Sequence, residues 1–346
     1  MSDKPARAVK LNVLNEPKDS YTGGPSSLCP GCGHDQISSV IITAAWENGI
    51  QPHRIAKMSG IGCSSKTPAY YLGQSHGFNT VHGRMPSVTT GAYAINKDLL
   101  YLGVSGDGDS ASIGIGQLIH AIRRNMDMVY IVENNGVYGL TKGQYSPTSE
   151  VGKVTKSTPM GSLDRPFNPL TLALGAGATF VSRTIDKETK HLQEMITRSH
   201  AHKGTSFMEI YQNCNIFNDG AFSSLTDKET KLDTVLWLEN KSPMIFGVEK
   251  NKGIRLDGNT PTVVEIGDKF SVDDILLHDE SDYVIASLLS NMTYNDDFPD
   301  PIGVLYSIED TRYEDMMMDQ IREATKKKGK STIQDIINAG DTWVVK

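Results

Sequence analysis

Residues 98–135 constrain the fold of this chain more than any other segment, because they read as strand, helix, strand. LLYLGVSG and MVYIVENN are the mostly apolar runs expected of buried strands. A helical crossover between two strands implies that they pair in parallel. Ligands of such open sheets bind beyond the carboxyl ends of the strands, which places SGDGD and ENNGVYG together at one edge. Between the two strands, apolar residues repeat at helical spacing, at Ile115, Leu118, Ile119 and Ile122.

The polar residues at these two strand ends suit a metal ion and a phosphate. The first strand ends in GDGD at residues 106–109, and the second ends in NN at residues 134–135. Carboxylate and amide oxygens from adjacent strand ends can converge on one hard cation, and phosphate oxygens can complete its coordination. The two glycines allow the backbone to approach a phosphate closely, and the helix from Asp109 onward presents its N-terminus to the same anion.

The chain has four cysteines, and all of them lie in contexts rich in glycine or asparagine. Two form the pair in LCPGCGH, the third is in GIGC and the fourth is in YQNCN; they are Cys29, Cys32, Cys63 and Cys214. A zinc ion and a four-iron four-sulfur cluster both accept four thiolates, so the number of ligands leaves both open. A structural zinc site usually takes two close pairs, whereas one pair and two distant cysteines fit a cluster buried in a fold better.

Composition restricts the class of protein. Hydrophobic residues make up 38% and charged residues 22% of the 346 residues, which is typical of a globular chain. No segment approaches the roughly 20 consecutive apolar residues that span a bilayer, and the first residues lack a signal-peptide run. We therefore expect no membrane association and a cytoplasmic location, where thiols stay reduced. The net charge of −7 and the absence of a long basic stripe argue against a nucleic-acid partner.

Along the chain we expect a polar N-terminal arm (1–27), a cofactor domain (28–220) and a C-terminal extension (221–346). The first cysteine pair leads into a helix that Gly49 closes. TFVSRTI and SFMEIYQ are the expected strands of a further α/β unit. In the C-terminal part, SDYVIASLLSN and MMMDQIREAT are helix-like, and the basic run at residues 326–330 is interpreted as a solvated helix end.

These motifs together resemble a known family. GDG followed by NN resembles the signature of the thiamine diphosphate-binding fold, in which the Asp, the second Asn and a backbone carbonyl two residues later hold Mg²⁺ against the diphosphate. Carried over to this sequence, these are Asp107, Asn135 and Val137. LCPGCGH, GIGC and GDGD together resemble the β subunit of 2-oxoacid:ferredoxin oxidoreductases, over roughly residues 20–220.

The resemblance implies a fold, an activity and a set of site residues. The fold is α/β, a mostly parallel sheet flanked by helices, with a C-terminal extension. The activity is oxidative decarboxylation of a 2-oxoacid with transfer of the acyl group to coenzyme A, or the reverse carboxylation. The four cysteines would ligate one four-iron four-sulfur cluster, and HGRMPSVTTGAY looks like the cofactor-proximal segment. The expected cofactor contacts are Ser64, His82, Gly106, Asp107, Gly108, Asp109, Asn135, Val137, Gly139, Leu140 and Thr141.

The resemblance also implies partners. In the family, an α subunit supplies the glutamate that activates the pyrimidine ring and most of the coenzyme A surface, so we expect an α2β2 assembly. This sequence has no second cysteine-rich segment that could act as a built-in ferredoxin. An external ferredoxin-like carrier is therefore the expected electron acceptor.

Two lysines favour 2-oxoglutarate, converted to succinyl-CoA, as the expected substrate. The stretch after the Asn pair reads NNGVYGLTKGQ, whereas pyruvate-specific relatives tend toward YSNTGGQ, so Leu140 and Lys142 replace small or neutral residues. A lysine there can pair with the distal carboxylate of 2-oxoglutarate, and Lys66 is a second candidate. The alternative for each lysine is a solvated group or a diphosphate contact. With His82, these residues are the catalytic candidates. Competing interpretations are an enzyme of pyruvate or branched 2-oxoacids, and a non-catalytic zinc-stapled scaffold.

Overall fold

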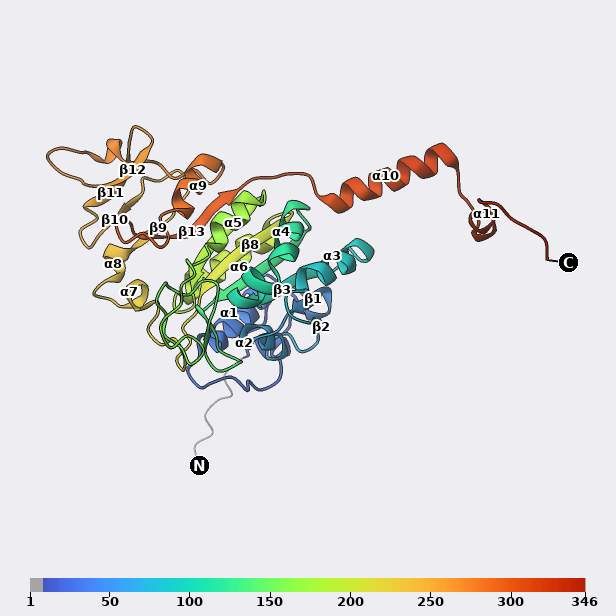
Figure 1. The fold of residues 1–346 in the computed structure, drawn as a ribbon, viewed down its shortest axis with the longest axis horizontal. Helices are drawn as coiled ribbons and strands as arrows, with labels where there is room; N and C mark the ends of the chain where they lie inside the picture. Colours follow the sequence, from blue (N-terminus) through green and yellow to red (C-terminus); the bar gives the residue numbers. More distant parts are fainter. Residues whose placement is uncertain (1–8, 346) are drawn as a thin grey trace, which may run out of the picture.

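A computed structural model describes residues 9–345. Its centre is an eight-stranded sheet with the strand order β2-β1-β3-β4-β8-β7-β13-β9 (Figure 1). Pairing is parallel from β2 through β7, and β13 is antiparallel to β7. The predicted mostly parallel sheet is therefore confirmed. The strands are β1 (Ile55–Ser59), β2 (His76–Asn79), β3 (Leu100–Gly106), β4 (Met128–Asn134), β7 (Phe180–Ile185), β8 (Thr205–Tyr211), β9 (Val235–Trp237) and β13 (Asp300–Ser307).

Helices cover both faces of the sheet, and each face has its own apolar core. Alternate residues of β4 point to opposite cores, because side chains of a strand alternate between faces. Val129 and Ile131 pack with one core, and Tyr130 and Val132 pack with the other. The first core includes α1 (Gly33–Glu47) and α6 (Thr189–Ala201). The second includes α3 (Met85–Ile95), α4 (Ile115–Arg123), α5 (Pro169–Gly175) and α9 (Tyr283–Ser290).

The predicted strand–helix–strand unit is present as β3, α4 and β4. The two strands pair in parallel, and the apolar stripe of α4 is buried at Leu118 and Ile122. Between β3 and α4 the chain makes a π-helical turn, η4 (Asp109–Ile113), so the helix that follows GDGD begins with a wide turn. Such turns often occur at functional sites. The helix expected after the first cysteine pair is α1, and Gly49 follows it with a φ of 62°.

The N-terminal segment packs on α1 in the part that the structure describes. It contains the 3₁₀ turn η1 (Lys18–Tyr21), and Tyr21 is completely buried. Asn12 Nδ2 donates a hydrogen bond to the Tyr21 hydroxyl at 2.9 Å, and Trp46 Nε1 of α1 donates to the Glu16 carbonyl at 2.9 Å. Asn12, Glu16 and Tyr21 thus anchor this segment to the body, and the part of the predicted arm at residues 1–8 lies outside the described residues.

The C-terminal third adds strands to the main sheet and then leaves the body. Its strands β9 and β13 extend the eight-stranded sheet, and a separate antiparallel sheet joins β10 (Ile245–Phe246), β11 (Lys252–Asp257) and β12 (Thr260–Glu265). Helices α10 (Tyr313–Lys328) and α11 (Ile333–Ile337) lead away from the body (Figure 1). The basic run lies at the exposed end of α10, as expected. The division into arm, cofactor domain and extension stays a prediction, since β9 and β13 share the main sheet.

None of the helices within residues 9–345 combines the length and the apolar character needed to cross a membrane.

Short elements complete the chain. The short helices are α2 (Cys63–Lys66), α7 (Ser223–Thr226) and α8 (Lys231–Thr234), the remaining 3₁₀ turns are η2 (Pro52–Arg54), η3 (Thr67–Ala69) and η5 (Val272–Asp274), and a small hairpin joins β5 (Val137–Tyr138) to β6 (Gln144–Tyr145).

Candidate active site

A cavity of about 320 Å³ lies where β3 and β4 end and α2 begins. All of the cofactor contacts expected from the sequence line it, although they come from segments as distant as Ser64 and Thr141. The parallel crossover explains this convergence, because it brings the carboxyl ends of both strands to the same edge. The lining also includes Cys63 and four residues that the sequence analysis missed: Ile61, Gly62, Ile113 and Tyr138.

Asp107 is a buried carboxylate at this edge, with 2% of its surface exposed. Its Oδ2 accepts hydrogen bonds from Ser146 Oγ at 2.5 Å and from Thr148 Oγ1 at 2.7 Å. Burial raises the pKa of the Asp107 carboxyl above its usual range, and these two hydroxyls oppose the rise. A charged carboxylate in such a place is costly unless a cation or further donors compensate it. The oxygens of this buried carboxylate are therefore suited to bind a divalent cation.

The two asparagines at the end of β4 have different surroundings. Asn134 donates to Glu209 Oε1 at 2.8 Å, and its Oδ1 accepts from Gly136 N at 3.1 Å. Asn135 lines the cavity, whereas Asn134 does not. The Asn135 Nδ2 donates to Gln212 Oε1 at 2.9 Å, which fixes the orientation of its amide. The position of Asn135 agrees with its expected role as a metal ligand, which stays a prediction.

Asp109 and Gly108 have structural contacts that the sequence does not reveal. The Asp109 carboxylate accepts from Gly83 N at 2.8 Å and from Ser105 Oγ at 2.7 Å, so both of its oxygens are bound within the protein. A Cβ at Gly108 would lie 2.2 Å from the ring of Tyr138. Packing against Tyr138 is thus a second reason for glycine at this position, besides access to a phosphate.

The four cysteines come from three separate segments, which are the loop before α1, the start of α2 and the segment after β8. Burial raises the pKa of Cys32 to about 12, and the other three thiols contribute to the rise. A Cβ on Gly139 would lie 3.6 Å from Cys63 Sγ and 3.7 Å from Cys214 Sγ. Cys29 is exposed and the other three are buried or half-buried; all four are free thiols. Within residues 9–345, no group of three or more His, Cys, Asp or Glu side chains is arranged around a single metal ion.

The substrate candidates lie at or outside the rim of the cavity. His82 and Leu140 line it and are exposed. Lys66 and Lys142 are exposed and are not part of the lining. Lys142 sits in the turn between β5 and β6 with a φ of 78°. The structure of this chain therefore brings the cofactor contacts together but leaves both lysines outside the cavity.

Sequence reasoning missed several polar neighbours of the site. Ser146 and Thr148 belong to no motif, and only the folding of their loop brings them to Asp107. His34 is another such neighbour: its Nδ1 lies 2.7 Å from Glu133 Oε2, and both side chains are buried.

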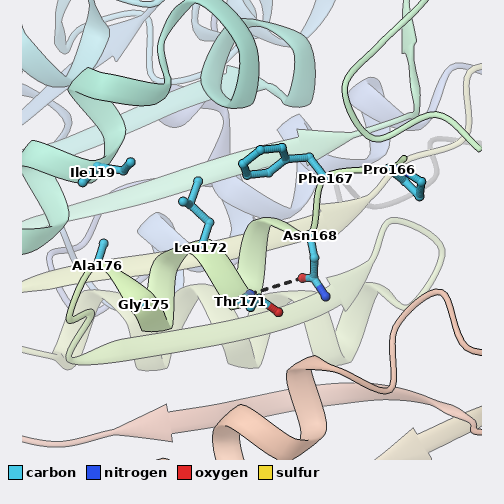
Figure 2. A pocket seen from close by; sticks show the side chains of 8 residues that line it. All are labelled: Ile119, Pro166, Phe167, Asn168, Thr171, Leu172, Gly175 and Ala176. Carbon is cyan, nitrogen blue, oxygen red and sulfur yellow. Dashed lines mark hydrogen bonds between the residues drawn. The ribbon is translucent and has the colours of Figure 1, made fainter. Parts of the chain in front are cut away.

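A more voluminous hollow lies between α4 and α5, with a volume of about 540 Å³. Figure 2 shows its lining, which includes Ile119, Phe167 and Leu172. No residue of the lining is charged, and Asn168 Oδ1 is used to accept hydrogen bonds from the first turn of α5 (Figure 2). The 320 Å³ cavity is lined by ionisable side chains such as Asp107 and His82, and the hollow between α4 and α5 is not. The smaller cavity is therefore the candidate active site.

The fold and this cavity place the chain in the class of proteins that have the thiamine diphosphate-binding fold. The family model described as thiamine pyrophosphate enzyme, C-terminal TPP binding domain, matches residues 60–210. This range includes the cavity residues from Ile61 to Thr141. The resemblance inferred from GDG and NN is therefore confirmed.

Known relatives narrow the class to one family. The chain is 42% identical over 332 residues to the 2-oxoglutarate oxidoreductase subunit KorB of Mycobacterium tuberculosis, covering 95% of this chain and 88% of the relative. It is also 42% identical over 206 residues to the 2-oxoacid:ferredoxin oxidoreductase subunit beta of Saccharolobus solfataricus, covering 59% of this chain and 68% of the relative. The chain belongs to the β subunits of 2-oxoacid:ferredoxin oxidoreductases.

A solved structure agrees with this assignment. The 2-oxoglutarate:ferredoxin oxidoreductase from Magnetococcus marinus, solved with 2-oxoglutarate, coenzyme A and succinyl-CoA bound, matches with a TM-score of 0.74 at 30% identity. The match covers 95% of this chain and 97% of that chain. The C-terminal third is thus included in the similarity of fold.

Proposed function

We propose that this chain is the β subunit of a coenzyme A-acylating 2-oxoglutarate:ferredoxin oxidoreductase, which converts 2-oxoglutarate to succinyl-CoA or runs the reverse carboxylation. The observation that carries the proposal is the 320 Å³ cavity, where every expected cofactor contact lies around the buried carboxylate of Asp107. The KorB relatives and the 2-oxoglutarate-bound structural neighbour support the choice of substrate.

Thiamine diphosphate and Mg²⁺ are the proposed cofactors of this cavity. Asp107, Asn135 and the Val137 carbonyl would hold the metal, and the backbone around Gly106 and Gly108 would face the diphosphate. Thiamine diphosphate, when bound, supplies the electron sink that decarboxylation of a 2-oxoacid requires. Ser146 and Thr148 hold the Asp107 carboxylate in a fixed orientation through their hydroxyls. Tyr138 packs on Gly108, and its hydroxyl donates a hydrogen bond to the Gly108 carbonyl at 3.2 Å.

The four cysteines are the proposed ligands of a four-iron four-sulfur cluster. Such a cluster binds one thiolate at each iron, so the four thiols need not converge on a single point. The positions of Cys63 Sγ and Cys214 Sγ, 3.6 Å and 3.7 Å from where a Cβ of Gly139 would lie, support this arrangement. When bound, the cluster supplies a one-electron acceptor. Cys63 and Gly139 also line the cofactor cavity, so the proposed cluster site is adjacent to the cavity.

A partner subunit fits the surroundings of the cavity. Ile113 and Leu140 line the cavity and are 56% and 45% exposed. Apolar side chains at the mouth of a site are suited to contact with another protein surface. We propose that an α subunit covers this mouth, supplies the activating glutamate and most coenzyme A contacts, and forms an α2β2 complex. A ferredoxin-like carrier is the proposed electron acceptor, and the cytoplasmic location stays a prediction.

An acceptor-reduction assay with the co-expressed α subunit tests the proposal. We expect reduction of ferredoxin or a low-potential dye that requires coenzyme A and thiamine diphosphate and is fastest with 2-oxoglutarate. A higher kcat/KM with pyruvate or a branched 2-oxoacid would assign the chain to the alternative substrates. Zinc without iron on elemental analysis, and no turnover with any 2-oxoacid, would instead support a zinc-stapled scaffold.

A further inference from the structure

We propose that Glu209 and Arg183 are positioning residues for the metal-binding carboxylate, acting through Asn134 and Thr148. The inference rests on the proposed function, because it assigns to these residues a role in holding Asp107 for Mg²⁺ and thiamine diphosphate. Arg183, Glu209 and Thr148 lie outside the motifs expected to bind the cofactor, and Asn134 is the residue of the NN motif that was not expected to bind the metal. Their contacts form a continuous buried path from the neighbouring strands to Asp107.

The path begins with an ion pair between two strands of the sheet. Arg183 of β7 and Glu209 of β8 are register partners, and Arg183 Nε donates to Glu209 Oε2 at 2.7 Å. Both side chains are 0% exposed. Arg183 Nη1 also donates to Thr293 Oγ1 at 2.6 Å, and its guanidinium stacks over the ring of Tyr211 at 4.7 Å. These contacts leave Glu209 little freedom to rotate.

The carboxylate of Glu209 then sets the orientation of Asn134. A carboxylate only accepts hydrogen bonds, so the Asn134 group that faces Glu209 Oε1 at 2.8 Å must be its NH₂. The Asn134 Oδ1 is thereby turned toward Gly136 N at 3.1 Å and Thr148 Oγ1 at 2.8 Å. A rotated amide would instead present its NH₂ to the Gly136 N–H.

Thr148 links this amide to the metal site. Its Oγ1 lies 2.8 Å from Asn134 Oδ1 and 2.7 Å from Asp107 Oδ2. A hydroxyl has one proton, so the hydrogen bonds that Thr148 Oγ1 donates to Asn134 Oδ1 and to Asp107 Oδ2 share it, and the second lone pair of the Asn134 oxygen holds the hydroxyl beside Asp107. Ser146 Oγ donates to the same oxygen, Oδ2. Two donors on one oxygen fix the rotation of the carboxylate about its Cβ–Cγ bond.

Fold stability alone does not explain the ion pair, because a buried pair is often no more stabilising than apolar residues of similar volume. A role in holding a functional carboxylate accounts for the location of the ion pair, which two hydrogen-bonded side chains, Asn134 and Thr148, connect to Asp107. The alternative is that Arg183 and Glu209 only hold the strands and the C-terminal segment together. The two roles predict different effects on cofactor affinity.

The test measures Mg²⁺-dependent affinity for thiamine diphosphate by titration calorimetry on the cofactor-stripped complex with the α subunit. Thr148→Val keeps the shape but removes the hydroxyl, and Thr148→Ser keeps the hydroxyl. We expect Thr148→Val and Glu209→Gln each to weaken affinity about tenfold, the effect of one hydrogen bond to a charged group. Thr148→Ser should restore affinity close to that of the unchanged protein.

A matched control uses a different ion pair, in which the carboxylate is buried and the arginine is 37% exposed. Glu280 accepts from Arg198 Nη1 at 3.0 Å and from Nη2 at 2.6 Å, and its side chain is 8% exposed. Glu280→Gln should lower the thermal midpoint but leave thiamine diphosphate affinity unchanged. If Glu209→Gln does not fold, the contrast between Thr148→Val and Thr148→Ser still decides the question.

A double variant tests the path itself. Glu209 and Thr148 are linked through Asn134, so the effect of Glu209→Gln should be smaller when Thr148 is already Val. Unchanged affinity in Thr148→Val, or affinity losses that simply add in the double variant, would overturn the inference. The Asp107→Ala variant distinguishes an error in the proposed metal site from an error in the positioning role. If this variant binds thiamine diphosphate normally, the proposed metal site is wrong. If only Asp107→Ala loses affinity, the positioning role alone is wrong.

Discussion

His34 Nδ1 lies 2.7 Å from Glu133 Oε2, and the two side chains are 1% and 0% exposed. His34 lies in the first turn of α1, just after Cys32, and Glu133 lies near the end of β4, just before the Asn pair. This contact joins the loop of the first cysteine pair to the strand end that carries Asn135. Burial raises the pKa of the Glu133 carboxyl, and the facing imidazole opposes the rise.

Replacing His34 by Leu should destabilise the fold, because it leaves the buried carboxyl of Glu133 without its partner. We expect the free energy of unfolding to fall by about 3 kcal/mol, the lower end for breaking a buried pair, since the carboxyl can take up a proton. Urea unfolding of both proteins measures the difference. His53 is exposed, so His53→Leu is the matched control and should change stability by less than about 0.5 kcal/mol. Equal losses in both variants would contradict the assignment.

Replacing Asp107 by Ala should weaken Mg²⁺ and thiamine diphosphate together, because the metal bridges the protein to the diphosphate. We expect at least about a tenfold loss in affinity for the cofactor, and the loss should disappear when Mg²⁺ is removed from both proteins. Titration calorimetry with and without a chelator measures it. A variant that keeps its Mg²⁺-dependent affinity would show that Asp107 does not bind the metal.

Gly139 provides a test of the cluster that leaves all thiols in place. A Cβ there would make ordinary contacts with Cys63 Sγ at 3.6 Å and with Cys214 Sγ at 3.7 Å, and Gly139 does not have a positive φ. Gly139→Ala should therefore fold normally, yet it should narrow the space between the two thiols and lower the iron content. Elemental analysis and visible absorbance measure the loss from about four iron atoms per chain.

Cys214→Ala should lose the cluster signal, because it removes one of the four proposed ligands. Full iron content in that variant would refute the four-cysteine assignment.

Lys142 and Lys66 test the choice of substrate. Both are exposed, and exposed ion pairs contribute about 0.2–1 kcal/mol, so neutralising either lysine should reduce kcat/KM for 2-oxoglutarate by at most about fivefold. Pyruvate lacks the distal carboxylate, so its kcat/KM should stay unchanged. Steady-state assays of Lys142→Met and Lys66→Met, with the α subunit present, measure both values. Equal losses on the two acids would mean that the lysines serve the cofactor or the shared 2-oxoacid end.

The buried side chain of Lys57 should make the free energy of unfolding depend on pH. Its Nζ is buried and donates to the carbonyls of Pro68 at 2.5 Å, Tyr71 at 2.7 Å and Leu72 at 3.0 Å. Burial lowers the pKa of Lys57 from 10.5 to about 8. Above pH 8 the unfolded chain therefore keeps a proton that the folded chain has lost, so this group makes stability rise with pH until its unfolded pKa is reached.

Lys57→Met should remove that rise. Comparing urea unfolding of both proteins at about pH 7.5 and pH 9.5, we expect the stability of the unchanged protein relative to the variant to increase with pH. A constant difference between the two proteins would mean that Lys57 titrates outside this range.

The sequence alone determined the elements that build the site. The apolar runs and the helical repeat between them identify β3, α4 and β4, because local periodicity reports which residues face a core. The crossover rule then fixes their parallel pairing, and GDGD and NN fall at the strand ends. For this reason the cofactor contacts could be named from the sequence, and the structure brings them around one cavity.

Only the tertiary structure decided which side chains support these residues. Ser146 and Thr148 reach Asp107, and Glu133 meets His34, through loops and strands that are distant in sequence. The approach of Cys63 and Cys214 to Gly139 and the exposure of Lys142 likewise depend on how loops fold back on the sheet edge. Such contacts have no local period, because they arise from packing between separate segments, and the sequence pattern therefore carries no signal for them.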